Sequence, residues 1–263
     1  MLSKIFKTKN FEFCWDFGSS YYRKQIFSDY KNKSDIESEN PFKAAQKEKN
    51  KEVFDISRKY LHTEILPNLG LNSYLCKNVE SDDIVSFLTT KVYKNDEIII
   101  VSMDKDFYQL VDKRVSVYNP ITKKIINEDF LIQEYNCNSN KISENFILYK
   151  SILGDGSDKI PGVPKCGVKT SIKLARQIID ECIDAKLKEK FLTEEYLELI
   201  ERNKKLIDFK SLDLISTISI EENINFVKET FKVDKEKAFK TLRDLEINTL
   251  YSKLIDFVGI PNG

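Results

Sequence analysis

The chain has 263 residues, and 41% of them are hydrophobic, which is enough for a sizeable core in one large or two modest domains. Its 42 basic and 42 acidic residues cancel, so the whole molecule offers no field that attracts nucleic acid, and any such affinity must come from local basic patches. The five cysteines lack CxxC spacing, which argues against a disulfide framework or a zinc site and for reduced thiols in a cytoplasm. The sequence contains neither a long apolar run nor a signal-peptide pattern, so we expect no membrane insertion and no secretion.

Short apolar runs in the first half of the chain predict strands. They lie at residues 11–15, 71–76, 97–102 and 115–118. The third run, EIIIVS, is nearly all β-branched, which is typical of a strand buried on both faces of a parallel sheet. Between the first two runs, residues 21–58 are polar and rich in lysine, which predicts an arched surface segment.

Helical spacing of apolar residues replaces the strand pattern from about Glu128 onwards, and glycine and proline punctuate residues 154–167. An earlier helix is expected over residues 84–93, because Asp82 and Asp83 would place negative charge in its first turn. We therefore predict an α/β fold with a mostly parallel sheet, followed by a largely helical region.

Four acidic clusters carry most of the chemical information. They are Asp16, then Glu80, Asp82 and Asp83, then Asp104 and Asp106, and finally Asp155 and Asp158. Carboxylates this dense raise one another's pKa unless cations neutralise them. All-oxygen ligation suits Mg²⁺ or Mn²⁺ and not zinc, and two such ions about 4 Å apart commonly cut phosphodiesters. The pattern therefore indicates a nuclease.

The alternative for each cluster is a set of solvated loop acids, and for one cluster alone that alternative would be favoured. However, three of the clusters follow predicted strands, and ligands gather beyond the carboxyl ends of strands in open α/β sheets. We therefore expect the clusters to meet in one crevice.

A second signal lies in the glycine-containing segment at residues 162–170. Such a hairpin points backbone N–H groups at an anion where it opens a helix, and Lys169 adds positive charge there. Lys165, Lys169, Lys173 and Arg176 recur on one face of that helix. The alternative is a solvated lysine face, but the stripe begins at the hairpin, which favours a grip on DNA phosphates.

The stretches WDFGSSYYRKQIFSDYKNK, VESDDIV, IVSMDKDFYQLV and YKSILGDGSDKIPGVPKCGVKT together resemble the flap-endonuclease or 5′–3′ exonuclease family, which includes phage 5′ nucleases and a domain of bacterial DNA polymerase I. The resemblance implies a PIN-like α/β nuclease core at residues 1–140, with a helical arch at about 21–58. It also implies a helix-three-turn-helix DNA-binding region with C-terminal helices at residues 141–263. Two Mg²⁺ or Mn²⁺ ions would be the cofactors, and in some relatives a K⁺ ion lies at the hairpin.

The resemblance also assigns roles to individual residues. Asp16, Glu80, Asp82, Asp83, Asp104 and Asp106 would serve the inner metal, and Asp155 and Asp158 the outer one. Lys31 and Arg23 would neutralise the reacting phosphate, and Tyr30 would stack on DNA. The remaining DNA contacts would come from Lys33, Gly162, Val163, Lys165, Gly167, Lys169, Thr170 and Lys173.

Three departures from the family pattern stand out. Lys165 and Cys166 replace a Gly-Ile pair in the hairpin, and Ser34 replaces an arginine of the arch. The third departure is that the first strand of the family, with its metal-binding aspartate, is missing from this sequence. We expect the chain to be poorly active alone, and a separate N-terminal fragment or an upstream extension of about 30 residues to restore activity.

The expected function is cleavage of phosphodiesters in 5′-flap, nicked or primer-containing duplexes by two-metal catalysis, in a bacterial or phage-infected cytoplasm. The expected partners are branched or nicked DNA, RNA/DNA primer hybrids and replication proteins. A duplex-DNA-binding module with an incomplete, inactive or partner-completed metal site is the main alternative. A structural protein that merely retains the fold is the weakest one, because the ligand positions remain acidic.

Overall fold

The computed structural model describes residues 2–32, 41–230 and 233–258. The chain forms two compact units that alternate along the sequence. The first unit holds residues 1–18, 34–84 and 214–263, and the second holds residues 19–33 and 85–213. The predicted functional division into residues 1–140 and 141–263 stays a prediction.

The first unit is built on two parallel strands, β1 (Glu12–Trp15) and β2 (Asn72–Leu75), and both were predicted. Its helices are α1 (Leu2–Phe6), α3 (Pro41–Tyr60), α10 (Leu214–Thr230), α11 (Lys235–Asp244) and α12 (Asn248–Val258), and α4 (Ser81–Phe87) begins in it. Short helical turns occupy Leu61–Ile65 and Pro67–Leu69. Asn223 of α10 bonds to both backbone groups of Leu75, with its Oδ1 accepting from the N–H at 3.2 Å and its Nδ2 donating to the carbonyl at 3.3 Å. This side chain therefore provides hydrogen-bond partners for the backbone of Leu75, the last residue of β2.

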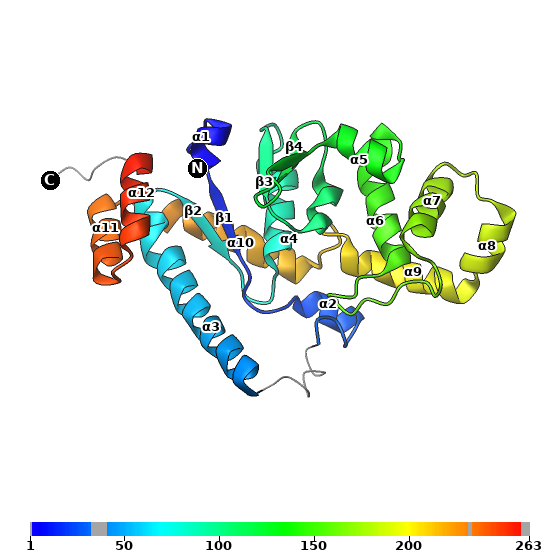
Figure 1. Ribbon diagram of the computed structural model, residues 1–263, viewed down its shortest axis with the longest axis horizontal. Helices are drawn as coiled ribbons and strands as arrows, with labels where there is room; N and C mark the ends of the chain where they lie inside the picture. Colours follow the sequence, from blue (N-terminus) through cyan, green and yellow to red (C-terminus); the bar gives the residue numbers. More distant parts are fainter. Residues whose placement is uncertain (1, 33–40, 231–232, 259–263) are drawn as a thin grey trace. The chain divides into compact units, whose positions relative to one another are not determined.

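The core of the first unit lies where α11 packs on the turns after α3. Phe239 and Leu242 are at most 1% exposed, and they lie in one cluster with Ile65, Leu66 and Leu69. In Figure 1, α3 runs as one long helix away from β1 and β2. The region predicted as an arched segment thus contains the helices α2 and α3, and residues 33–40 between them lie outside the described residues.

The second unit carries three strands, β3 (Ile98–Val101), β4 (Val115–Asn119) and β5 (Lys124–Ile126). β3 and β4 pair in parallel, as predicted, whereas β5 returns antiparallel to β4. The tight return is explained by Asn119, whose side chain accepts the N–H groups of Ile121 and Thr122 at 3.0 Å each. We did not predict β5, and the described strands form two small sheets instead of one.

Helices make up most of the second unit. They are α2 (Tyr21–Ile26), α5 (Glu128–Tyr135), α6 (Ile142–Leu153), α7 (Val168–Ile179), α8 (Ala185–Phe191) and α9 (Glu194–Ile207), with short helical turns at Leu88–Val92, Lys105–Leu110 and Ser139–Lys141. Polar caps explain where several begin, for example Asn127, whose side chain accepts the N–H of Phe130 at 3.1 Å. α6 is the central helix, and it packs against α7 and α9. The helical character predicted after Glu128 is confirmed.

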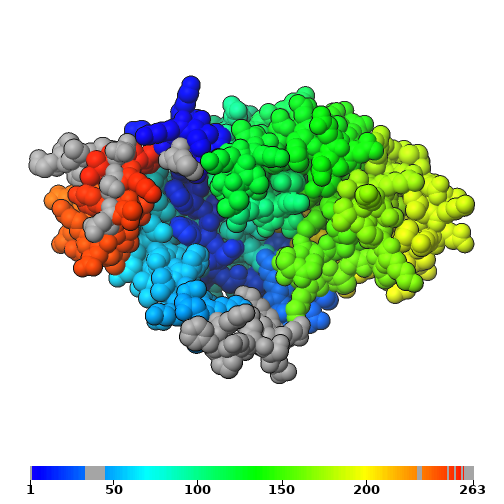
Figure 2. All heavy atoms as spheres, in the orientation of Figure 1, coloured from blue at the N-terminus to red at the C-terminus, as the bar shows by residue number. Residues whose placement is uncertain are grey.

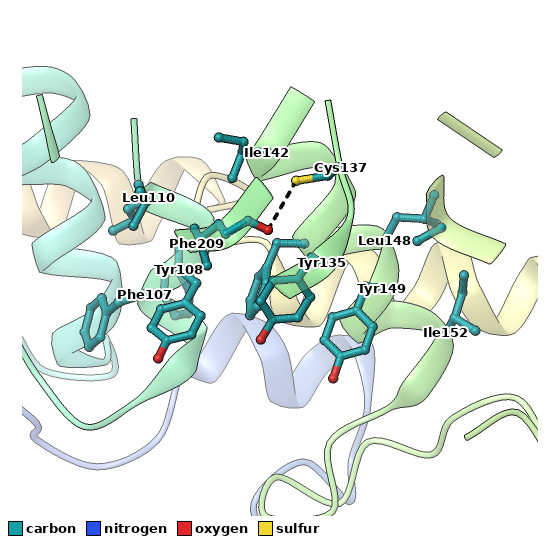
Figure 3. Close-up of a cluster of buried hydrophobic side chains, with 14 of the residues drawn as sticks. Phe107, Tyr108, Leu110, Tyr135, Cys137, Ile142, Leu148, Tyr149, Ile152 and Phe209 are labelled. Carbon is teal, nitrogen blue, oxygen red and sulfur yellow. Dashed lines mark hydrogen bonds between the residues drawn. The ribbon is translucent and has the colours of Figure 1, made fainter. Parts of the chain in front are cut away.

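The core of the second unit is rich in aromatic rings. Figure 3 shows Tyr108, Tyr135 and Tyr149 in a row, and the centroids of Tyr135 and Tyr149 are 5.2 Å apart. Burial and the neighbouring phenols raise the pKa of Tyr135 well above its ordinary value. The row therefore stays neutral and acts as packing material. In the described part of the chain, no helix is both long and apolar enough to cross a membrane.

Candidate functional site

The carboxylates of the first unit are held by backbone N–H groups. Asp16 directly follows β1, and its Oδ1 accepts the N–H of Ser81 at 2.8 Å. Asp83 is 1% exposed, and its carboxylate reaches back to accept the N–H of Glu80 at 3.3 Å. The carbonyl of Glu80 accepts the N–H of Asp83 in return at 3.1 Å, which closes the first turn of α4. Asp83 is therefore a helix-capping residue as well as a candidate ligand.

Glu80 and Asp82 complete this group. Glu80 is 3% exposed although its side chain is ionisable, and such burial requires partners or a cation. Asp82 lies in the first turn of α4 and accepts the Ser81 hydroxyl at 3.3 Å. Asp16, Glu80, Asp82 and Asp83, which we call the α4 carboxylates, thus lie at the start of one helix.

The carboxylates of the second unit surround a lysine that sequence reasoning missed. The ammonium of Lys150 on α6 lies 2.8 Å from Asp106 and 2.5 Å from Asp155. The three side chains are only 13–18% exposed. Lys150 is thus a cation between two largely buried carboxylates. Asp106 and Asp155, 49 positions apart in sequence, are brought together in this way.

These contacts shift the pKa values in opposite directions. Burial raises the pKa of Asp106, and the attraction to Lys150 does not fully offset it. Burial also acts to raise the pKa of Asp155, but hydrogen bonds from Lys150 and Ser157 outweigh it, and this pKa falls below its usual value. Burial acts to lower the pKa of Lys150, but its two carboxylate partners prevail and raise it, so the lysine stays charged.

Asp104 and Asp158 flank this pair. Asp104 follows β3, and its side chain accepts the N–H of Asp106 at 2.8 Å at the start of the turn Lys105–Leu110. Asp158 accepts the Tyr30 hydroxyl at 3.3 Å, and the Lys31 ammonium lies 3.7 Å away. We call Asp104, Asp106, Asp155 and Asp158 the α6 carboxylates.

The loop that carries Asp155 and Asp158 depends on two glycines. A Cβ on Gly162 would lie 1.9 Å from the Leu153 carbonyl oxygen, and one on Gly154 would lie 2.4 Å from the Gly162 nitrogen. Gly154 also has φ of +80°. Between them, Asp155 and Ile160 exchange two backbone hydrogen bonds of 2.8 Å. Gly162, predicted as a DNA contact, thus has a steric role in closing the loop.

Two predicted residues of the arch have structural partners. Arg23 is 1% exposed, and its Nε donates to the carbonyl of Leu206 at 2.8 Å, which ties α2 to α9. Its role toward phosphate stays a prediction. Tyr30 is 2% exposed and packs with Ile160, Leu206 and Ile207. The ring is therefore buried in this structure, and the stacking of Tyr30 on DNA stays a prediction. Lys33 lies outside the described residues.

The hairpin leads into α7, as predicted. Val163 and Cys166 are 3% and 5% exposed, so their side chains belong to the core and only their backbone remains available. Lys165 adopts φ of +59°, the left-handed conformation that suits the glycine of the family pattern. Gly167 caps α7, and Lys169 and Lys173 are exposed while Thr170 is half-buried. Lys169, Lys173 and Arg176 line a shallow hollow of about 450 Å³.

The carboxylate oxygens of these residues are the donors that a hard divalent ion prefers. Between Asp106 and Asp155, the Lys150 ammonium already occupies a position that suits a cation. Among the described residues, however, no three His, Cys, Asp or Glu side chains are arranged closely enough to hold a metal. The donor chemistry fits Mg²⁺ or Mn²⁺, and the carboxylates would have to draw closer around an ion.

Known proteins resemble the chain in sequence. A 5′–3′ exonuclease of Buchnera aphidicola subsp. Schizaphis graminum is 29% identical over 179 residues, covering 67% of this chain and 56% of that protein. DNA polymerase I of Streptococcus pneumoniae strain R6 is 30% identical over 246 residues, covering 87% of this chain and 26% of the polymerase. The chain thus spans about half or less of the length of these relatives.

Solved structures share its fold. The 5′-exonuclease of bacteriophage T5 with bound zinc aligns with a TM-score of 0.71 at 21% identity, covering 87% of this chain and 86% of that one. A flap endonuclease of the same phage with DNA and metal ions aligns with a TM-score of 0.67 at 20% identity, again covering 87% and 86%. The resolvase-like, PIN-type fold is therefore confirmed.

Residues 1–136 match the family described as the 5′–3′ exonuclease, N-terminal resolvase-like domain. This match spans more than half of the chain, and the chain belongs to the 5′–3′ exonuclease family.

Proposed function

We propose that the chain is a divalent-metal-dependent 5′ nuclease that hydrolyses phosphodiesters in 5′-flap, nicked or primer-containing duplexes. The observation that carries this proposal is the Lys150 ammonium between Asp106 and Asp155. Its position shows that two carboxylates of this fold lie close enough together to bind one cation between them. The bacterial exonuclease and DNA polymerase I relatives support the same chemistry.

The α4 carboxylates and the α6 carboxylates would hold two Mg²⁺ or Mn²⁺ ions. A pair of such ions supplies a nucleophilic water near neutral pH and neutralises charge on the leaving oxygen. Within the chain, Ser81 and Glu80 contribute backbone N–H groups that orient Asp16 and Asp83. Lys150 helps to lower the pKa of Asp155, and it holds Asp106 and Asp155 close together, where both could act as ligands.

Two lysine groups would serve the DNA. Lys31 lies 3.7 Å from Asp158 and is partly exposed, so its ammonium can approach a phosphate beside a candidate ligand. Lys169 and Lys173 on α7 would contact the duplex backbone, with the hairpin amides beside them. Contacts of this kind recognise the shape of the DNA backbone and do not depend on the base sequence. A K⁺ ion at the hairpin is part of the proposal.

The test is incubation of the chain with a 5′-labelled flap duplex, with Mg²⁺, with Mn²⁺ and with EDTA. Metal-dependent products that carry 5′-phosphate and 3′-OH ends support the proposal. A second candidate, a duplex-binding module without cleavage, is favoured by the lack of a closely arranged ligand cluster among the described residues. Tight, salt-sensitive flap binding without products in either metal would select that second candidate.

A further inference from the structure

We propose that His62 is a positioning residue for the candidate metal ligand Asp16. It acts through two intervening side chains, those of Ser73 and Trp15. The inference rests on the proposed function, because Asp16 serves as a ligand only if the α4 carboxylates bind metal. All four residues belong to the first unit, and His62, the only histidine of the chain, lies in the helical turn that directly follows α3. Figure 2 shows the described part of α3 (light blue) at the surface of the face that is drawn.

The Ser73 hydroxyl is the centre of a short chain of hydrogen bonds. It accepts the indole N–H of Trp15 at 2.8 Å and lies 2.9 Å from Nδ1 of His62. Ser73 is 0% exposed, so its hydroxyl proton needs an acceptor within the protein. The indole N–H can only donate, and therefore the acceptor of this proton is Nδ1 of His62. The donors thus run in order from Trp15 through Ser73 to His62.

This order requires a neutral imidazole, because a protonated ring has no acceptor. Burial lowers the pKa of His62, and the positive charge of Arg58 lowers it further. Arg58 lies near the end of α3, about one helical turn before His62, which explains why its charge acts on the ring. The ring is therefore neutral near neutral pH and accepts the Ser73 proton.

The indole fixes the end of the strand that leads into the candidate site. Trp15 is the last residue of β1, and Asp16 follows it. Because successive side chains along a strand point to opposite faces, the indole holds the backbone from the face opposite to the Asp16 carboxylate. The carboxylate accepts the N–H of Ser81 at 2.8 Å, and the carbonyl of Asp16 accepts from Arg58. Loss of the anchor at Trp15 should therefore let Asp16 move relative to Ser81.

The experiment follows two proton signals of the full chain by NMR in EDTA. Trp15 is the only tryptophan, so its indole N–H gives a single signal. The amide signal of Ser81 reports the hydrogen bond to Asp16. His62→Leu and Ser73→Ala should shift both signals. His62→Asn keeps a side-chain acceptor near the position of Nδ1 and should leave both signals close to those of the wild type.

Mn²⁺ titration followed by electron paramagnetic resonance then measures the consequence for the candidate site. His62→Leu should weaken the binding of one ion by about tenfold, the lower end of the range for loss of a group that orients a ligand. His62→Asn should stay within about threefold of the wild type. The matched control is Thr63→Ala, because the Thr63 side chain is exposed and its hydroxyl donates to the Lys59 carbonyl. This variant should change neither the two signals nor the affinity for Mn²⁺.

An unshifted Ser81 amide signal in His62→Leu would overturn the proposal. Equal effects of His62→Leu and His62→Asn would overturn it as well, because only the packing of the ring would then matter. Thermal melting checks that each variant is folded, and if His62→Leu does not fold, Ser73→Ala with an unshifted Ser81 amide decides against the proposal. A wild type that binds no Mn²⁺, in which the variants still shift the Ser81 signal as expected, would contradict only the proposed function.

Discussion

The two groups of carboxylates are held together by different means. The α4 carboxylates lie at a helix start, where the backbone N–H groups of Glu80 and Ser81 bind Asp83 and Asp16. The central pair of the α6 carboxylates, Asp106 and Asp155, is instead bridged by the Lys150 ammonium. Backbone amides orient carboxylates without cancelling their charge, whereas a lysine cancels about one charge. We therefore expect a bound metal to neutralise most of the charge of the α4 carboxylates. In the α6 carboxylates, the Lys150 side chain should neutralise part of the charge even without a metal.

The largest expected effect is on cleavage. Asp155→Asn removes a candidate ligand and one negative charge while leaving the α7 lysines in place. Flap cleavage should fall by about a thousandfold, or about 4 kcal/mol of transition-state stabilisation, with DNA affinity unchanged within a few-fold or raised. Single-turnover kinetics and flap-DNA titration measure the two quantities. Turnover like that of the wild type would remove Asp155 from the site.

The next effect concerns stability and separates the two groups directly. Lys150→Met leaves Asp106 and Asp155 facing each other without their cation. The free energy of unfolding should fall by about 2–3 kcal/mol, less than the loss for a fully buried pair. Adding Asp106→Asn should recover part of this loss. The control is Lys204→Met, because its ion pair with Glu201 is exposed and should contribute under about 1 kcal/mol. Equal losses in the two lysine variants, measured by urea unfolding, would refute the role of Lys150.

A smaller effect tests the amide contacts of the α4 carboxylates. Ser81 is the first residue of α4, where proline is tolerated, so Ser81→Pro removes the N–H that Asp16 accepts without breaking the helix. Cleavage should fall about tenfold, as expected when a group that orients a ligand is lost. Ser81→Ala keeps the N–H and should retain activity within about threefold. If the two variants behave alike in the cleavage assay, the amide does not orient Asp16.

The smallest effect lies outside both carboxylate groups. Lys169→Ala should weaken binding to every duplex sequence alike, by a few-fold, and should reduce the slope of log K against log salt by about one unit. Stability and metal affinity should not change. Binding titrations at several salt concentrations measure the slope, and an unchanged slope would mean that Lys169 is only a solvated surface residue.

Much of the fold could be predicted because local patterns decide it. The strand at Ile98–Val101 follows from its β-branched run, and the start of α4 follows from Asp82 and Asp83. The strand β5 escaped prediction because it has only three residues, Lys124–Ile126, and two of them are exposed. The separation into two sheets could not be predicted, because it depends on which strands pair with one another across long stretches of sequence, and local patterns do not determine such pairing.

The acidic residues of the candidate site could be predicted from the sequence, but the lysine between two of them could not. Asp106 and Asp155 stand out in motifs, whereas Lys150 lies inside an apolar helix and looks like an ordinary solvated lysine. Its role depends on the packing that brings α6 against the turn after β3. The packing of Tyr30 could not be predicted either: its motif predicts a contact with DNA, which stays a prediction, and its ring packs against residues from the loop at Ile160 and from α9.

The central claim is that both groups of carboxylates bind divalent metal, and Mn²⁺ binding measured by electron paramagnetic resonance tests it most directly. The wild type should bind two ions per chain in the presence of flap DNA. Asp155→Asn and Asp82→Asn should each lose one of them, while Lys169→Ala keeps both. Two ions retained in either aspartate variant, or no Mn²⁺ bound by the wild type, would contradict the account.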